Sequence, residues 1–136
     1  TSQQIVNYLL SSLKKIKINI NERRKNIRVI IDDYNRCFAF IVEKGSGISC
    51  RIIDISLGGM KCQVDDINFL QYFSAGNELK LIHLYIKSYH IIASGKIIYV
   101  SKPYFAIEFT YLSEKDKDNL SVSIFNLLSE NNQFLI

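Results

Sequence analysis

Two short clusters of polar residues contain most of the side chains in this sequence that could bind a ligand. The first cluster occupies residues 23–28 (RRKNIR) and places Arg24 and Arg28 four positions apart. An arginine guanidinium holds its donors in a planar fork, which matches two phosphate oxygens or the O6 and N7 acceptors of guanine. This cluster therefore predicts a cationic arm that binds an anionic group.

The second cluster occupies residues 54–59 (DISLGG) and has the complementary chemistry. The carboxylate of Asp54 can accept hydrogen bonds from the N1 and N2 donors of guanine, and Ser56 adds a hydroxyl. Gly58 and Gly59 allow the backbone to come close to a flat ligand. Together, the two clusters indicate a ligand that is anionic and carries guanine.

Each cluster also has a purely structural interpretation. The basic residues could form a solvated arm before the first strand, although Glu22 alone cannot neutralise them. The second cluster could be a turn in which Asp54 caps local amides and glycine supplies a positive φ. Both interpretations of the second cluster can hold at once, because a carboxylate fixed by a tight turn loses less freedom when it binds a ligand.

In order, residue type and separation, the clusters resemble the signature of the PilZ family, bacterial receptors for cyclic di-GMP (c-di-GMP). That signature is an RxxxR arm followed by a (D/N)xSxxG turn, and the matching residues are Arg24, Arg28, Asp54, Ser56 and Gly59. Residues 106–114 are similar to the family's closing strand and the start of its terminal helix, except that Ala106 stands where members commonly have Gly. Either motif alone would be weak, and their pairing at this spacing carries the resemblance.

The resemblance implies a receptor for c-di-GMP that is not an enzyme and needs no cofactor. In such a receptor Arg24 and Arg28 would hold phosphate and the Hoogsteen edge of guanine, while Asp54 would bind the other guanine face with Ser56. The ligand-binding residues that it implies are Arg23, Arg24, Arg28, Asp54, Ser56, Gly58 and Gly59.

The resemblance also implies a stoichiometry and an output. An Arg just before RxxxR, here Arg23, accompanies binding of an intercalated ligand dimer in the family, but Glu22 beside it can neutralise its charge. One and two ligands per chain therefore both remain open. The arm would fold over the ligand and move residues 1–22, and an upstream domain or a downstream effector protein would sense the change.

Length and charge agree with a single domain that captures an anion locally. The chain has 136 residues and a net charge of +4, and residues 14–36 alone carry a net +5 from eight basic and three acidic side chains. A basic segment on a nearly neutral body favours a local anion site over a surface coated for nucleic acid.

Other chemistry is not indicated. Cys37, Cys50 and Cys62 lack CxxC spacing and lie in strand-like runs, which predicts buried thiols and no metal site. His83 and His90 have no nucleophile or carboxylate pattern around them, and the chain has no GxxxxGK(S/T), GxSxG or HExxH motif. No apolar run reaches the roughly 20 residues of a membrane span and no signal peptide opens the chain, so we expect a cytoplasmic protein.

Hydrophobic periodicity predicts the elements that position the two clusters. Residues 1–21 have apolar side chains at helical spacing, which predicts a helix or linker, and the start at Thr1 is compatible with a fragment of a longer protein. Residues 22–136 form the expected domain, in which residues 65–76 could be a helical turn or a loop. Strand-like runs predict a six- to seven-stranded antiparallel barrel, and they occupy residues 27–31, 36–42, 48–54, 60–64, 78–87, 90–100 and 104–110.

A flanking C-terminal helix should follow the last of these strands. Ser113 is the expected N-cap, and Glu114 and Asp116 lie in the first turn, where acidic side chains are favourable. The expected apolar stripe, which would pack against the barrel or a second subunit, consists of Leu120, Ile124, Leu127 and Leu128.

Two other functions remain open from the residues. A small basic barrel could bind single-stranded RNA or DNA through its cationic arm and an aromatic rim, since most of the eight tyrosines are expected in the core or at the rim. That interpretation leaves Asp54 unexplained, because a carboxylate is poorly suited to a phosphate backbone. A degenerate PilZ-like module that only docks proteins is the other alternative.

Overall fold

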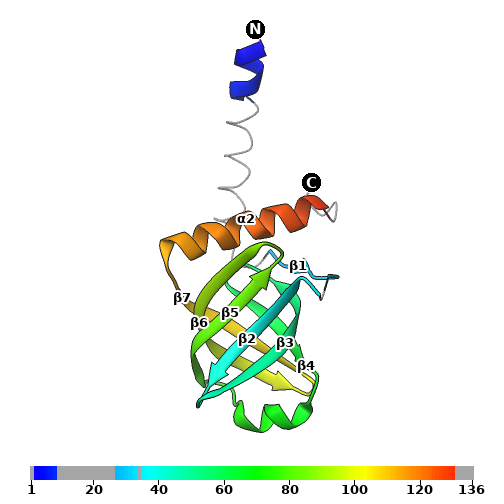
Figure 1. Ribbon diagram of the computed structural model, residues 1–136, viewed down its shortest axis with the longest axis vertical. Coiled ribbons are helices and arrows are strands. Elements are labelled where there is room, and N and C mark those ends of the chain that lie inside the picture. Colours follow the sequence, from blue (N-terminus) through cyan, green and yellow to red (C-terminus); the bar gives the residue numbers. More distant parts are fainter. Residues whose placement is uncertain (1, 9–26, 34, 131–136) are drawn as a thin grey trace.

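The computed structural model describes residues 2–8, 27–33 and 35–130. Residues 2–8 are helical, and the remainder of the expected N-terminal helix or linker lies outside the described residues. The strands of the described ranges are β1 (Val29–Ile30), β2 (Cys37–Glu43), β3 (Ser46–Ile55), β4 (Gly59–Val64), β5 (Glu78–Ile86), β6 (Tyr89–Ser101) and β7 (Tyr104–Leu112). A 3-10 helix, η1 (Ile67–Tyr72), follows β4, and the helix α2 (Glu114–Glu130) follows β7 (Figure 1).

Six of these strands close into an antiparallel barrel. They pair in the order β3, β2, β5, β6, β7, β4, and β4 pairs with β3 to complete the ring. The short strand β1 pairs with the end of β3 as an additional strand. In Figure 1, β2 and β5 cross the front of the barrel, and β7 and β4 lie behind them. The predicted barrel of six to seven strands is confirmed.

Alternating side chains fill the inside of the barrel. The inward residues are almost fully buried and mostly β-branched or aromatic, as a closed sheet requires. Cys37, Cys50 and Cys62 are all buried in this core, which confirms their predicted structural role. Burial raises the pKa of the Cys62 thiol well above its ordinary value, and the neighbouring Cys50 thiol raises it further.

The helix α2 lies across one end of the barrel, and the short helix η1 lies at the other end (Figure 1). At one end the backbone N–H of Asp116 donates to Ser113 Oγ at 3.1 Å, which confirms the predicted N-cap of α2. The predicted apolar stripe of α2 is buried against the barrel, at Leu120, Ile124, Leu127 and Leu128. At the other end, η1 occupies the segment expected to be a helical turn or loop and buries Leu70. Within the described residues, no helix combines the length and apolar character needed to span a membrane.

Candidate ligand-binding site

The pairing of β1 with β3 brings the two predicted clusters together. Arg28 immediately precedes β1, and Asp54 lies opposite Ile30 near the end of β3. Arg28 Nη1 donates to Asp54 Oδ1 at 2.7 Å, and these side chains are 45% and 21% exposed. The bond uses one donor of the guanidinium fork. A cation with a planar fork and a carboxylate therefore stand side by side at the protein surface.

The hydroxyl of Ser56 is directed into the turn rather than toward solvent. Ser56 is fully buried, its Oγ accepts from the backbone N–H of Gly58 at 3.2 Å, and its own N–H donates to the carbonyl of Gly59 at 2.8 Å. These bonds fix the turn that follows Asp54. In this structure Ser56 shapes the backbone beside the carboxylate and has no exposed surface with which to touch a ligand.

Gly59 is required by strand packing. A Cβ atom at this position would overlap the carbonyl oxygen of Ile107 on β7, so only glycine allows β4 and β7 to come this close. Among the described residues, positive φ values at glycine occur at Gly45 and Gly76. The expectation that a glycine of the second cluster supplies a positive φ is therefore wrong. The N–H of Phe109 also donates to the carbonyl of Gly58, at 2.8 Å, which ties the turn to β7.

Arg23 and Arg24, the other predicted arm residues, lie outside the described residues. Of the predicted site, the structure thus brings Arg28 and Asp54 into contact and places Ser56, Gly58 and Gly59 in the adjoining turn.

The Arg28–Asp54 pair lines a groove of about 410 Å³. Strand register places its walls in one row across the outside of the barrel, because Asp54 pairs with Lys61, Lys61 with Ala106, and Ala106 with Tyr99. The sequence interpretation missed Lys61 and Tyr99 as groove residues. The lining residues are Arg28, Asp54, Lys61, Ile98, Tyr99 and Ala106.

Two irregularities in the sheet orient the ends of this row. The register of β3 against β4 shifts between Ile52 and Asp54, and the register of β6 against β7 shifts between Ile97 and Tyr99. A β-bulge inserts one residue and re-aims the side chains after it. Ile52 and Ile97 are fully buried, whereas Asp54 and Tyr99, two positions later, line the groove.

A larger groove of about 590 Å³ lies between Leu57 and the start of α2. Its charged lining consists of Glu114, Asp118 and Lys117, and Lys117 forms an ion pair with Glu114 at 3.4 Å. The lining of the smaller groove has two cations, Arg28 and Lys61, for one carboxylate. Charge therefore favours the smaller groove for an anionic ligand. In the part of the chain that the structure describes, no three His, Cys, Asp or Glu side chains are grouped as metal ligands would be.

Solved structures share this architecture at low sequence identity. The PilZ domain of YcgR from Escherichia coli, solved with c-di-GMP, has a TM-score of 0.68 and 19% identity, and the match covers 82% of this chain and 95% of that one. MrkH of K. pneumonia in its apo state has a TM-score of 0.67 and 20% identity, with coverage of 82% and 53%. The inhibitor of motility MotI/DgrA of Bacillus subtilis has a TM-score of 0.60 and 16% identity, with coverage of 79% and 53%.

The chain thus spans only about half the length of MrkH and MotI/DgrA. No curated protein matches it significantly in sequence. The family model of the PilZ domain matches residues 22–126, which is most of the chain. The chain therefore belongs to the PilZ family.

Proposed function

We propose that this domain is a receptor that binds c-di-GMP in the groove around Arg28 and Asp54. The observation that carries the proposal is the 2.7 Å contact between Arg28 Nη1 and Asp54 Oδ1, formed by two signature residues that are 26 positions apart. A groove of 410 Å³ with two cations and one carboxylate offers partners for both the phosphates and the guanine of such a ligand. Membership of the PilZ family supports the same ligand.

In the proposed binding mode, Arg28 and Asp54 contact different groups of the ligand. The guanidinium fork of Arg28 binds phosphate or the O6 and N7 acceptors of a guanine, and Asp54 accepts from the N1 and N2 donors. Arg24 and Arg23 supply further cations from the arm. Each charge-assisted hydrogen bond contributes about 1.5–3 kcal/mol net. Several such bonds together outweigh the entropy cost of ordering a flexible side chain.

Ser56, Gly58 and Gly59 have a positioning role in this proposal. The Ser56 hydroxyl holds the amide of Gly58, and the missing side chain of Gly59 allows β7 to approach. Both features fix the backbone directly after Asp54. Their substitution should weaken binding through the geometry of the turn.

The proposed output is a change in the arm that precedes β1. Arg28 adjoins β1, and β1 lies against both β3 and α2, so a ligand that draws Arg28 from Asp54 acts on the segment that leads into the barrel. An adjoining domain or a separate effector protein would sense this change. Hydrogen exchange over residues 14–30 should slow when c-di-GMP binds. Unchanged exchange there would contradict the arm model but not ligand binding itself.

Isothermal titration calorimetry with c-di-GMP tests the proposed site. Arg24→Ala, Arg28→Ala and Asp54→Ala should each weaken binding by roughly 10- to 100-fold, the equivalent of one lost charge-assisted bond. Arg36→Ala is a matched control, because Arg36 belongs to the same basic segment, is exposed and is absent from the groove lining. Cyclic di-AMP and GTP serve as competitors. Wild-type affinity in all three site variants would eliminate the proposal.

A further inference from the structure

We propose that the groove continues beyond the signature residues, with Lys61 as a phosphate-binding cation and Tyr99 as a stacking surface for a guanine base. This inference rests on the proposed function and specifies how the part of the ligand remote from Asp54 is held. It concerns two residues outside both sequence clusters. The structure places them in the same outward row as Asp54.

The row has the order of chemical groups that a dinucleotide needs. From β3 to β6 it presents the carboxylate of Asp54, the ammonium of Lys61, the methyl group of Ala106 and the phenol ring of Tyr99. Neighbouring strands lie about 4.8 Å apart, so the three steps of the row span roughly 14 Å. A base bound at Asp54 thus leaves a phosphate near Lys61 and a second base near Tyr99.

Lys61 is held close to the outside of β4. Its Nζ lies 4.6 Å from the centroid of the Tyr104 ring, within the range of a cation–π contact. The residue is half-buried, and its strand pairing places it directly beside Asp54. The contact restrains a long side chain near the position where phosphate is expected, which lowers the entropy that binding must remove.

Ala106 forms the floor between the two ends of the row. Its side chain points outward, since the neighbouring Phe105 and Ile107 point into the core, and it is only 7% exposed because larger neighbours surround it. A methyl group at this position keeps the floor low. A planar ligand can therefore lie over it and reach both walls.

Tyr99 provides the far wall. The bulge at Ile98 turns the phenol outward, and Tyr99 is 42% exposed. Among the described residues its ring stacks on no other ring. A phenol in this position has a face available for stacking on a base, an interaction that tolerates any purine.

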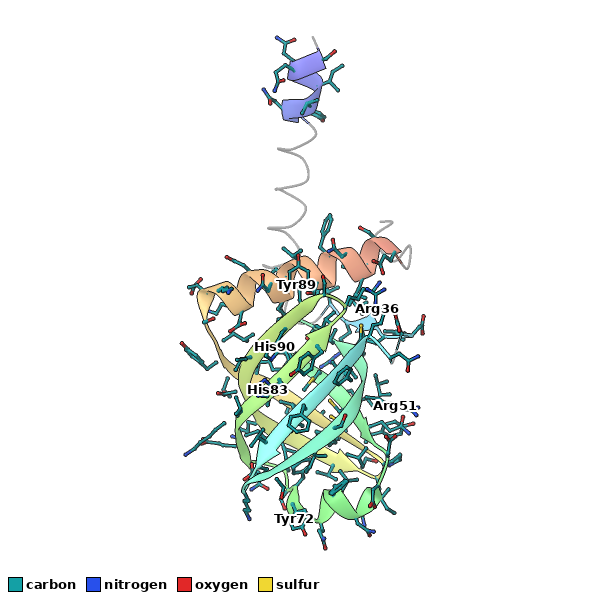
Figure 2. All side chains as sticks on the ribbon, viewed as in Figure 1. Arg36, Arg51, Tyr72, His83, Tyr89 and His90 are labelled. Atoms are coloured by element: carbon teal, nitrogen blue, oxygen red, sulfur yellow. The ribbon has the colours of Figure 1, made fainter. Side chains whose placement is uncertain are left out.

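Fluorescence offers a direct test, because the chain contains no tryptophan. Tyr99→Trp introduces one reporter in the groove, and Tyr72→Trp places the same reporter in η1, at the barrel end opposite α2 (Figure 2). Saturating c-di-GMP should quench the reporter at position 99 strongly and leave the reporter at position 72 unchanged. Calorimetry on the same samples establishes that the ligand is bound. Bound ligand without quenching at position 99 would overturn the role of Tyr99.

Affinity variants separate the two residues. Tyr99→Ala should weaken c-di-GMP binding by roughly tenfold while Tyr99→Phe stays near wild type, because stacking needs the ring and not the hydroxyl. Lys61→Met should also weaken binding by about tenfold and reduce its dependence on salt. Lys80→Met, an exposed lysine on β5, is the matched control.

The outcomes distinguish this inference from the function on which it rests. Binding by the wild type with unchanged affinity in Tyr99→Ala and Lys61→Met would overturn the extended groove and leave the receptor proposal standing. Absence of binding by the wild type would overturn both. Thermal melting of each variant shows whether it is folded, and Tyr99→Phe and Lys61→Met keep the side-chain size almost unchanged.

Discussion

On the side of the barrel formed by β2, β5 and β6, Phe38, Tyr85 and His90 stand in an outward cross-strand row and stack on one another. The ring centroids are 5.0 Å apart between Phe38 and Tyr85 and 4.6 Å apart between Tyr85 and His90. Across β3, β4 and β7, and ending at the far end of β6, Asp54, Lys61, Ala106 and Tyr99 form a row that borders a groove. We call these the aromatic row (Phe38, Tyr85, His90) and the groove row (Asp54, Lys61, Ala106, Tyr99).

The two rows differ in which chemical groups are left for a partner. In the aromatic row the ring faces contact each other, and the neighbouring His83 bonds His90 through Nδ1 and Nε2 at 2.8 Å. These contacts stabilise the sheet, and the Tyr85 ring is stacked on both of its cross-strand neighbours. In the groove row the charged groups and the ring of Tyr99 surround open space. The comparison therefore weighs against the aromatic row as a platform for the bases of single-stranded RNA or DNA.

Filling the groove at Ala106 should have the largest effect on c-di-GMP affinity. Ala106→Leu would fill the floor between Lys61 and Tyr99 without removing a charged partner, so we expect c-di-GMP binding to fall at least about 100-fold in calorimetry. Ser49→Leu makes the same kind of change at an exposed position of β3 opposite Phe40, outside the groove. It should leave affinity unchanged. Normal affinity in folded Ala106→Leu would contradict binding across this row.

The next largest effect on c-di-GMP affinity should come from changing the shape of the Arg28 side chain while keeping its charge. Arg28→Lys keeps the positive charge but replaces the planar fork with a single ammonium, so affinity should fall roughly tenfold. Arg36→Lys provides the control, and both are compared in one calorimetric series. Equal affinity of Arg28→Lys and wild type would indicate that Arg28 acts only through its charge.

A change in the aromatic row should affect stability and spare binding. Tyr85→Ala removes the stacking contacts of this ring with Phe38 and His90 and its longer contact with His83, and because the ring is partly exposed we expect a loss of about 1–2 kcal/mol in urea unfolding. The affinity of the folded variant for c-di-GMP should stay at the wild-type value. If Tyr85→Ala instead abolished binding of a single-stranded oligonucleotide, the aromatic row would be a nucleic-acid surface after all.

The smallest predicted effect is on the pH dependence of stability, and it concerns a thiol in the barrel interior. Because burial raises the pKa of Cys62 in the folded state, the unfolded chain loses this proton first as the pH rises. The associated stability is fully present below the ordinary pKa of a thiol and declines as the pH rises above it. Urea unfolding of wild type and Cys62→Val from pH 7 to 10 measures the difference. Parallel pH profiles would contradict the contribution of this thiol.

Much of the fold was predictable because its signals are local. Alternation of apolar residues gave the seven strands to within a few positions, and Ser113 with the stripe from Leu120 to Leu128 gave α2. Spacing and residue type also predicted that Arg28 and Asp54 belong to one site, and the pairing of distant strands brings the two side chains into contact.

The remaining features depend on tertiary geometry that no local pattern encodes. The bulge at Ile98 determines that Tyr99 faces outward, and a sequence with regular alternation cannot locate such an insertion. The need for glycine at position 59 arises from a carbonyl on β7, almost fifty residues later. The tyrosines were expected mostly in the core or at the rim, yet Tyr8, Tyr72, Tyr99 and Tyr111 are exposed.

Amide chemical-shift mapping of the complete chain by NMR tests the difference between the two rows most directly. Titration with c-di-GMP should shift the resonances of Asp54, Lys61, Ala106 and Tyr99 and leave those of Phe38, Tyr85 and His90 in place. Shifts confined to the aromatic row, or no shifts at saturating ligand, would contradict a c-di-GMP site in the groove.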